Sequence, residues 1–309
     1  MLQENIALRH AEPSAEPANI QDWSKAYRNR DNATFFAMVR NDLDQLDETA
    51  LGLTEGRSFK RGLRAAIGLL GEYGLVGYTI RLAQALIRFD RQPSYWSHSF
   101  LFHSAVPTAP QQIRARNTGA PIIWESTIDF TGPVPQLHMV NGVSPRYLRD
   151  YNRTRFDLLS HHCVPNVGVV VFALSEDEVN RILQRATDPN VDALRYDFSG
   201  LIGTWFAYIM TRQNEMNPLG AGYAVYCSAY CQLAYDAISL DLATGAHARN
   251  TSPEHIWQAG KWFSEVYSRL GFPVRVYSCI RDPYCQMIPV EEKASMSLDQ
   301  AVHRLRGLR

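Results

Sequence analysis

The sequence predicts an α+β protein in which a helical N-terminal region, residues 20–90, precedes a domain of strands and helices, residues 91–290. Two patterns support this prediction. Apolar residues recur at helical spacing from Ile20 to about Phe89. From Tyr95 onwards, β-branched and aromatic runs alternate with helix-start signals. The chain has 309 residues, 46% of them hydrophobic, so it is long enough to bury a large core.

Residues 1–19 are rich in Ala, Pro, Glu and Ser and are predicted to be a flexible tail. They lack the basic start and apolar run of a Sec signal. The protein is therefore expected to be cytoplasmic, or to be exported by a signal-independent secretion system. In the helical region, Asp31 or Asn32 is expected to cap a first helix. A second helical run is expected over Phe59–Phe89.

Strands are expected at four places in the second domain, and a loop rich in Pro, Gly and Asn is expected at Thr131–Pro145. The expected strands are Ser97–Phe102, Pro121–Ser126, Val167–Leu174 and Phe272–Cys279.

Helix starts are marked by capping residues and by proline. Ser175 followed by Glu178 forms a capping-box pattern, and Ser252 precedes Pro253 at a first helical position. A further helix is expected to begin at Cys227. Residues 291–309 are expected to form a C-terminal helix, because their leucines and a valine fall on one face.

The composition disfavours two classes of protein. The 31 Lys and Arg balance the 31 Asp and Glu, and a zero net charge disfavours a nucleic-acid binder, which needs a basic surface. Five cysteines are too few for a disulfide-built scaffold of this length. The most apolar long stretch, Gly62–Phe89, is interrupted by charged residues, so it is not expected to span a membrane.

Cys227 is the strongest candidate for a catalytic nucleophile. It follows a Gly-containing loop and opens a predicted helix, where the helix dipole and free N–H groups favour the thiolate. The same N–H groups suit the developing oxyanion of acyl transfer. His98 is expected to act as the base, and Glu125 to orient it if their two strands are neighbours.

The same residues allow other interpretations. Cys227 is otherwise a buried apolar thiol, and Glu125 an exposed carboxylate. His103 is the competing base, but its offset of five places it on the opposite strand face from His98, so only one can serve. Cys231, one helical turn after Cys227, is expected to be a core residue, with a resolving thiol as the alternative.

The order of these motifs resembles the circularly permuted NlpC-type papain-like hydrolases, in particular the YiiX-type branch. The resemblance spans about residues 90–285. Two features depart from it: the usual Gly-Asp before the histidine strand is missing, and Ala229 replaces the usual Glu after Cys-Ser. The matching features are Ser97-His98, Glu125 followed by Gly142-Val143, Tyr196-Asp197, Tyr226-Cys227-Ser228 and Ser252-Pro253.

The resemblance implies a permuted papain-like (NlpC-type) fold, with an antiparallel sheet packed on helices. It also implies a cysteine peptidase or amidase that needs no metal or organic cofactor. A Cys-His-Glu triad would cleave an amide bond, most commonly in cell-wall peptide. The residues expected to contact the substrate or its oxyanion are Ser228, Tyr196 and Trp124.

Two other functions stay open. Related permuted folds act on lipids, so a phospholipase or acyltransferase is the first alternative, with residues 62–89 touching a membrane surface. The second alternative is a non-catalytic module that binds a partner through the N-terminal third. An immunity or delivery protein is the expected partner of a secreted effector.

The remaining cysteines suggest no metal centre. His161-His162-Cys163 together with Cys279 and Cys285 matches no compact zinc motif, so no metal site is expected. In an oxidising compartment, Cys279 and Cys285 could instead form a disulfide.

Overall fold

The computed structural model describes residues 24–28, 30–53, 56–72, 75–88, 90–115, 120–131, 138–152, 164–192, 226–243, 246–266 and 273–281. The predicted tail 1–19, the predicted C-terminal helix in 291–309 and the Gly-containing loop before Cys227 lie outside these residues.

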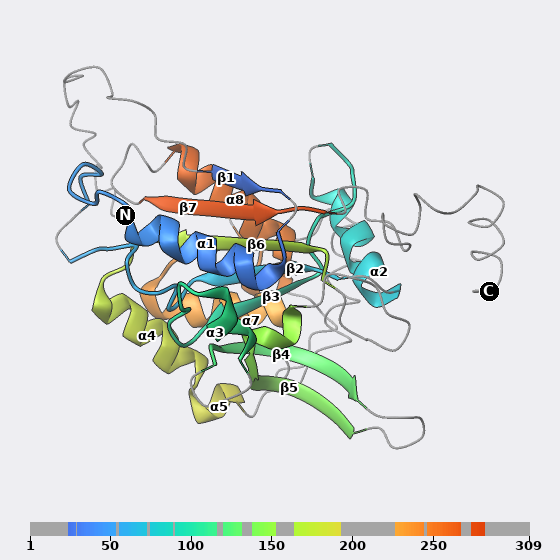
Figure 1. The fold of residues 1–309 in the computed structure, drawn as a ribbon. Coiled ribbons are helices and arrows are strands. Elements are labelled where there is room, and N and C mark those ends of the chain that lie inside the picture. Colours follow the sequence, from blue (N-terminus) through green and yellow to red (C-terminus); the bar gives the residue numbers. More distant parts are fainter. Residues whose placement is uncertain are drawn as a thin grey trace.

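A seven-stranded sheet forms the centre of the fold (Figure 1), which confirms the predicted α+β class. The strand order is β1-β7-β6-β2-β3-β4-β5. The strands are β1 (Ser24–Tyr27), β2 (Ile67–Gly71), β3 (His98–Phe102), β4 (Ile122–Thr131), β5 (His138–Tyr147), β6 (Asn166–Phe172) and β7 (Val274–Cys279).

The sheet is mixed, whereas the resemblance implied an antiparallel one. β1 runs parallel to β7, and the other neighbouring strands pair antiparallel. β1 and β7 come from opposite ends of the described chain, so no short hairpin forces them to run in opposite directions.

Helices cover both faces of the sheet. Figure 1 shows α1 in front of the sheet and α8 behind it. The α-helices are α1 (Asn32–Asp44), α2 (Leu75–Ala83), α3 (Pro110–Arg114), α4 (Glu176–Ala186), α5 (Pro189–Asp192), α7 (Cys227–Tyr235) and α8 (Pro253–Val266). The 3-10 turns are η1 (Gln84–Leu86), η2 (Leu148–Tyr151), η3 (Asp236–Ile238) and η4 (Ala248–Asn250).

Side-chain caps start the helices where the sequence predicted them. Asp31 is the N-cap of α1 and accepts a hydrogen bond from the backbone of Thr34. Ser175 and Glu178 form the expected capping box of α4. The hydroxyl of Ser252 accepts a bond from the backbone N–H of His255, so it caps α8.

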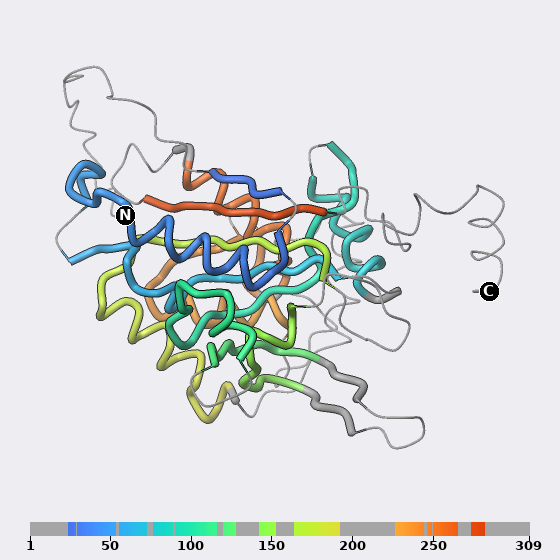
Figure 2. The backbone as a smooth tube through the Cα atoms, viewed as in Figure 1, coloured from blue at the N-terminus to red at the C-terminus, as the bar shows by residue number. Residues whose placement is uncertain are grey.

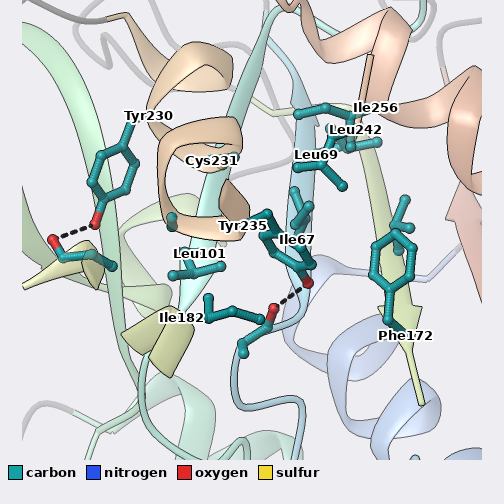
Figure 3. Packing of buried hydrophobic residues seen from close by; sticks show 14 of the residues in the cluster. Ile67, Leu69, Leu101, Phe172, Ile182, Tyr230, Cys231, Tyr235, Leu242 and Ile256 are labelled. Atoms are coloured by element: carbon teal, nitrogen blue, oxygen red, sulfur yellow. Dashed lines mark hydrogen bonds between the residues drawn. The ribbon is translucent and has the colours of Figure 1, made fainter. Parts of the chain in front are cut away.

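Each face of the sheet buries its own apolar cluster. One cluster joins the sheet to α4, α7 and α8, and the other joins it to α1 and α3. Figure 3 shows part of the first cluster, in which Tyr235 of α7 lies near Ile67 of β2 and Tyr230 points away from β2, on the other side of the helix. Packing on both faces makes β2 and β6 wholly buried strands.

The predicted helical run Phe59–Phe89 is wrong at β2, where the chain is extended. A Cβ at Gly68 would lie 2.1 Å from the ring of Phe100, and one at Gly71 would lie 2.0 Å from the carbonyl of Tyr95. These glycines therefore allow the backbone of β2 to lie close to Phe100 and Tyr95. A short apolar run has no periodicity that separates a strand from a buried helix.

The predicted loop Thr131–Pro145 is also wrong, because it contains most of strand β5. β5 is an edge strand, and an edge strand tolerates Pro145, which has no N–H to donate. Asn141, Gly142 and Pro145 therefore occur within a strand at the border of the sheet.

The predicted region 20–90 is also not purely helical, because it supplies β1 and β2 to the common sheet. β2 pairs with β3 on one side and with β6 on the other, in the middle of the sheet (Figure 2). The strands from before and after residue 90 therefore form a single sheet. No helix among the described residues is long and apolar enough to cross a membrane.

Candidate active site

The two strands predicted to carry the base and its orienting carboxylate are neighbours. β3 and β4 pair antiparallel, with Leu101 opposite Trp124. The Nε2 atom of His98 lies 2.8 Å from an Oε atom of Glu125. His98 is 7% exposed and Glu125 is 0% exposed, so this pair is shielded from water. A buried bond of this kind fixes the orientation of the imidazole ring.

Cys227 is the first residue of α7, and its side chain is 3% exposed. His98 and Ser99 are the residues that act most strongly on its thiol, so they lie next to Cys227. Because Nε2 of His98 is held by Glu125, Nδ1 is the ring nitrogen left for the thiol. The structure thus brings Cys227, His98 and Glu125 together from α7, β3 and β4.

The electrostatics of the pair favour a charged state. Burial alone would raise the pKa of Cys227, but the charge and hydrogen bond of His98, together with the bonds from Ser99, lower it below that of an ordinary thiol. Burial alone would lower the pKa of His98, but Cys227 and Glu125 raise it well above its usual value. The two pKa values therefore shift in the directions that favour a thiolate beside an imidazolium.

The start of α7 has no side-chain cap. Its N-cap residue is Tyr226, whose side chain forms no capping hydrogen bond. The first N–H groups of a helix have no partner within the helix, so they are natural donors to a negative oxygen beside Cys227.

Cys231 lies one turn further along α7, in a different environment. It is fully buried, and its sulfur lies 3.8 Å from the hydroxyl oxygen of Ser99. Burial raises the pKa of its thiol, and the nearby Cys227 raises it further. Its place in the apolar cluster agrees with the core position predicted for it.

Glu125 is held by two further residues that the sequence analysis missed. The hydroxyl of Tyr151, in η2, donates to both carboxylate oxygens at 2.7 Å. The Nε atom of Arg146, on β5, lies 3.6 Å from one of them. Both residues come after the predicted loop Thr131–Pro145, in a stretch that carried no chemical motif, so no local signal pointed to them.

Ser99 was also missed, although it directly follows His98. Alternation along a strand places Ser99 on the opposite face from His98. That face meets α7, and Ser99 reaches both thiols of this helix. Only the packing of α7 on β3 reveals this contact.

The residues predicted to contact the substrate have different surroundings in the structure. The hydroxyl of Ser228 is buried and donates to the carbonyl of Thr251 at 2.7 Å, so it ties α7 to the segment before α8. Trp124 is half-buried and lies beside the ring of His103, at 6.2 Å between centroids. Tyr196 lies outside the described residues.

His103 was the competing base in the sequence. It follows β3, and its backbone N–H donates to the carbonyl of Ile122. Burial lowers its pKa, helped by the charge of Arg64.

The described cysteines are Cys227, Cys231 and Cys279, and all three are free and buried thiols. Cys163 and Cys285, which the zinc and disulfide hypotheses need, lie outside the described residues. Within the part of the chain that the structure describes, no three His, Cys, Asp or Glu side chains group so that they could hold a metal ion.

No protein-family model matches this chain, and comparisons with curated proteins and with solved structures gave no significant match. The resemblance to permuted NlpC-type hydrolases therefore rests on the order of the motifs quoted above.

Proposed function

We propose that the protein is a cysteine hydrolase that cleaves an acyl bond, with Cys227 as nucleophile, His98 as base and acid, and Glu125 as the residue that orients His98. One observation supports this most: a single buried histidine is hydrogen-bonded to a buried carboxylate and acts electrostatically on a thiol at a helix start. The pKa shifts of the thiol and the imidazole run in opposite directions, as an activated nucleophile requires.

The reaction would proceed in two balanced steps. The Cys227 thiolate attacks the carbonyl carbon, the carbon–nitrogen bond breaks, and His98 gives its proton to the leaving amine. Water then attacks the resulting thioester, and His98 takes a proton from this water. The carbon–sulfur bond breaks, the acid leaves, and Cys227 returns to the thiolate.

The family resemblance favours an amide substrate of the cell-wall peptide type. A permuted papain-like domain would then supply the scaffold, and the side chains of Tyr196 and Trp124 would contact the peptide. Neither the thiol chemistry nor the Glu125 contact distinguishes an amide from an ester, since both present a carbonyl carbon to the thiolate.

One feature favours a lipid ester as the second candidate. Leu82 and Leu86, one helical turn apart on α2 and η1, are 47% and 40% exposed. Arg81 and Gln84, on the same stretch, are buried. Exposed leucines over a buried polar side are the reverse of the usual helix pattern, and they suit contact with acyl chains.

The test uses the full chain with labelled cell-wall peptide and, separately, with labelled phospholipid vesicles. Wild-type protein should release one product, and Cys227→Ala should lower the rate by a factor on the order of 1,000 or more. Fatty-acid release without peptide cleavage would select the lipid substrate. Full activity in Cys227→Ala would overturn the proposal, and Cys231→Ala serves as the matched control.

A further inference from the structure

We infer that Tyr151 is a positioning residue of this site, which fixes the Glu125 carboxylate and through it the ring of His98. The inference rests on the proposed function and extends it beyond the three residues of the triad.

The contacts give Tyr151 a direct hold on the carboxylate. Its hydroxyl lies 2.7 Å from each oxygen of Glu125, and Oε2 also lies 2.8 Å from Nε2 of His98. Tyr151 is 4% exposed and Glu125 is fully buried, so no bulk water competes for these bonds. The hydroxyl must be the donor because a carboxylate only accepts.

Tyr151 is itself fixed by two other elements. Its ring stacks on Phe100 of β3 at 6.0 Å with an interplanar angle of 4°. Phe100 lies two residues after His98, on the same strand face. The backbone carbonyl of Tyr151 accepts a 2.6 Å bond from Nδ2 of Asn32, at the start of α1. The hydroxyl is therefore held in a fixed position relative to His98.

The bond partner of Tyr151 sets it apart from two other buried tyrosines. The hydroxyls of Tyr230 and Tyr235 donate to the backbone carbonyls of Ala186 and Ala65. These bonds attach α7 to two other backbone segments of the protein. Tyr151 donates to a side chain that can rotate and that touches His98. Its hydroxyl therefore orients a side chain of the candidate site, whereas the other two hydroxyls only connect backbone segments.

Without the Tyr151 hydroxyl, the Glu125 carboxylate would lie between Arg146 and His98 with no donor that bonds both of its oxygens. Arg146 lies on the Oε1 side at 3.6 Å, and its charge would draw the carboxylate away from His98. A weaker bond to Nε2 would weaken the imidazolium that stabilises the Cys227 thiolate. Burial and the charge of Glu125 raise the pKa of Tyr151 well above its usual value, so the phenol stays a donor at any working pH.

The test measures the alkylation rate of Cys227 by iodoacetamide against pH, which needs no knowledge of the substrate. Tyr151→Phe keeps the stacked ring and removes only the hydroxyl. The midpoint of its rate profile should move to higher pH, with alkylation below the midpoint about three- to ten-fold slower. Tyr235→Phe, which also removes a buried hydroxyl, should keep the wild-type midpoint.

A second pair of variants separates positioning from general loss of packing. If Tyr151 acts through the carboxylate, Tyr151→Phe should add no further slowing in a Glu125→Gln background. An unchanged midpoint in Tyr151→Phe, or equal slowing in both backgrounds, would overturn the role of Tyr151 and leave the proposed function standing. Wild-type Cys227 that reacts no faster than a free cysteine would instead overturn the proposed function.

Discussion

Two successive turns of α7 each carry a cysteine, and the pKa values of the two thiols are shifted in opposite directions. Cys227 in the first turn has a lowered pKa, and Cys231 in the second turn has a raised one. Both thiols are buried and both contact Ser99, so neither burial nor Ser99 explains the difference. His98 explains the difference, because it lowers the pKa of Cys227 and is not among the causes that shift the pKa of Cys231. A buried thiol becomes a nucleophile when a cationic partner offsets the cost of its burial.

The largest expected effect is the selectivity of alkylation between the two thiols. At pH 6.5, iodoacetamide should modify Cys227 faster than Cys231 by a factor on the order of 1,000, because reactivity follows the thiolate fraction and access. Peptide mapping of briefly treated protein by mass spectrometry measures both rates in one sample. Equal labelling of the two sites would abolish the contrast.

The next effect comes from removing the cation. His98→Gln keeps a polar group of similar reach but no charge, and burial then acts alone on Cys227. The alkylation of Cys227 at pH 6.5 should fall by a factor on the order of 100. In wild-type protein the rate rises as pH increases through the lowered pKa of the thiol. In His98→Gln this rise should move above the pH range of an ordinary thiol, and a profile that stays in place would assign the activation to another group.

A smaller effect is expected from Ser99, the residue that both thiols share. Ser99→Ala removes one donor to Cys227 and keeps the backbone N–H bond, so Cys227 alkylation at low pH should slow by about three- to ten-fold. Stopped-flow measurement of the alkylation rate checks this, with Ser97→Ala as the neighbouring hydroxyl control. A loss as large as that of His98→Gln would make Ser99 an equal source of thiolate stabilisation.

The smallest effect is structural and concerns the second thiol. Cys231→Ala removes a buried sulfur from the apolar cluster and should lower the free energy of unfolding by about 1 kcal/mol. Urea unfolding followed by circular dichroism measures this change, and substrate turnover should stay at the wild-type level. Loss of turnover with an intact fold would support the alternative of Cys231 as a resolving thiol.

The sequence predicted the parts of this site that have local signals. A cysteine at a helix start, a histidine on a strand and a carboxylate on the next strand were each visible, because capping and alternation act within a few residues. Tyr151 and Arg146 were not visible, because they reach Glu125 only once β5 pairs with β4. The strand nature of β2 was missed for a similar reason: its glycines make sense only against Phe100 and Tyr95.

The position of β2 in the sheet affects how the chain can fold. β2 lies between β3 and β6 in the sheet. β1 pairs with β7, so it can pair only after the ribosome has synthesised Val276 and the rest of β7. Pairings so distant in sequence slow folding, because the closure of long loops must precede their contacts. During synthesis both edges of β2 would stay unpaired until β3 and β6 have been made, and a strand with unpaired edges is prone to aggregate. A chain without residues 1–90 would lack β2. This strand connects β3 and β4, which carry His98 and Glu125, to β6 and β7 on the other side of the sheet.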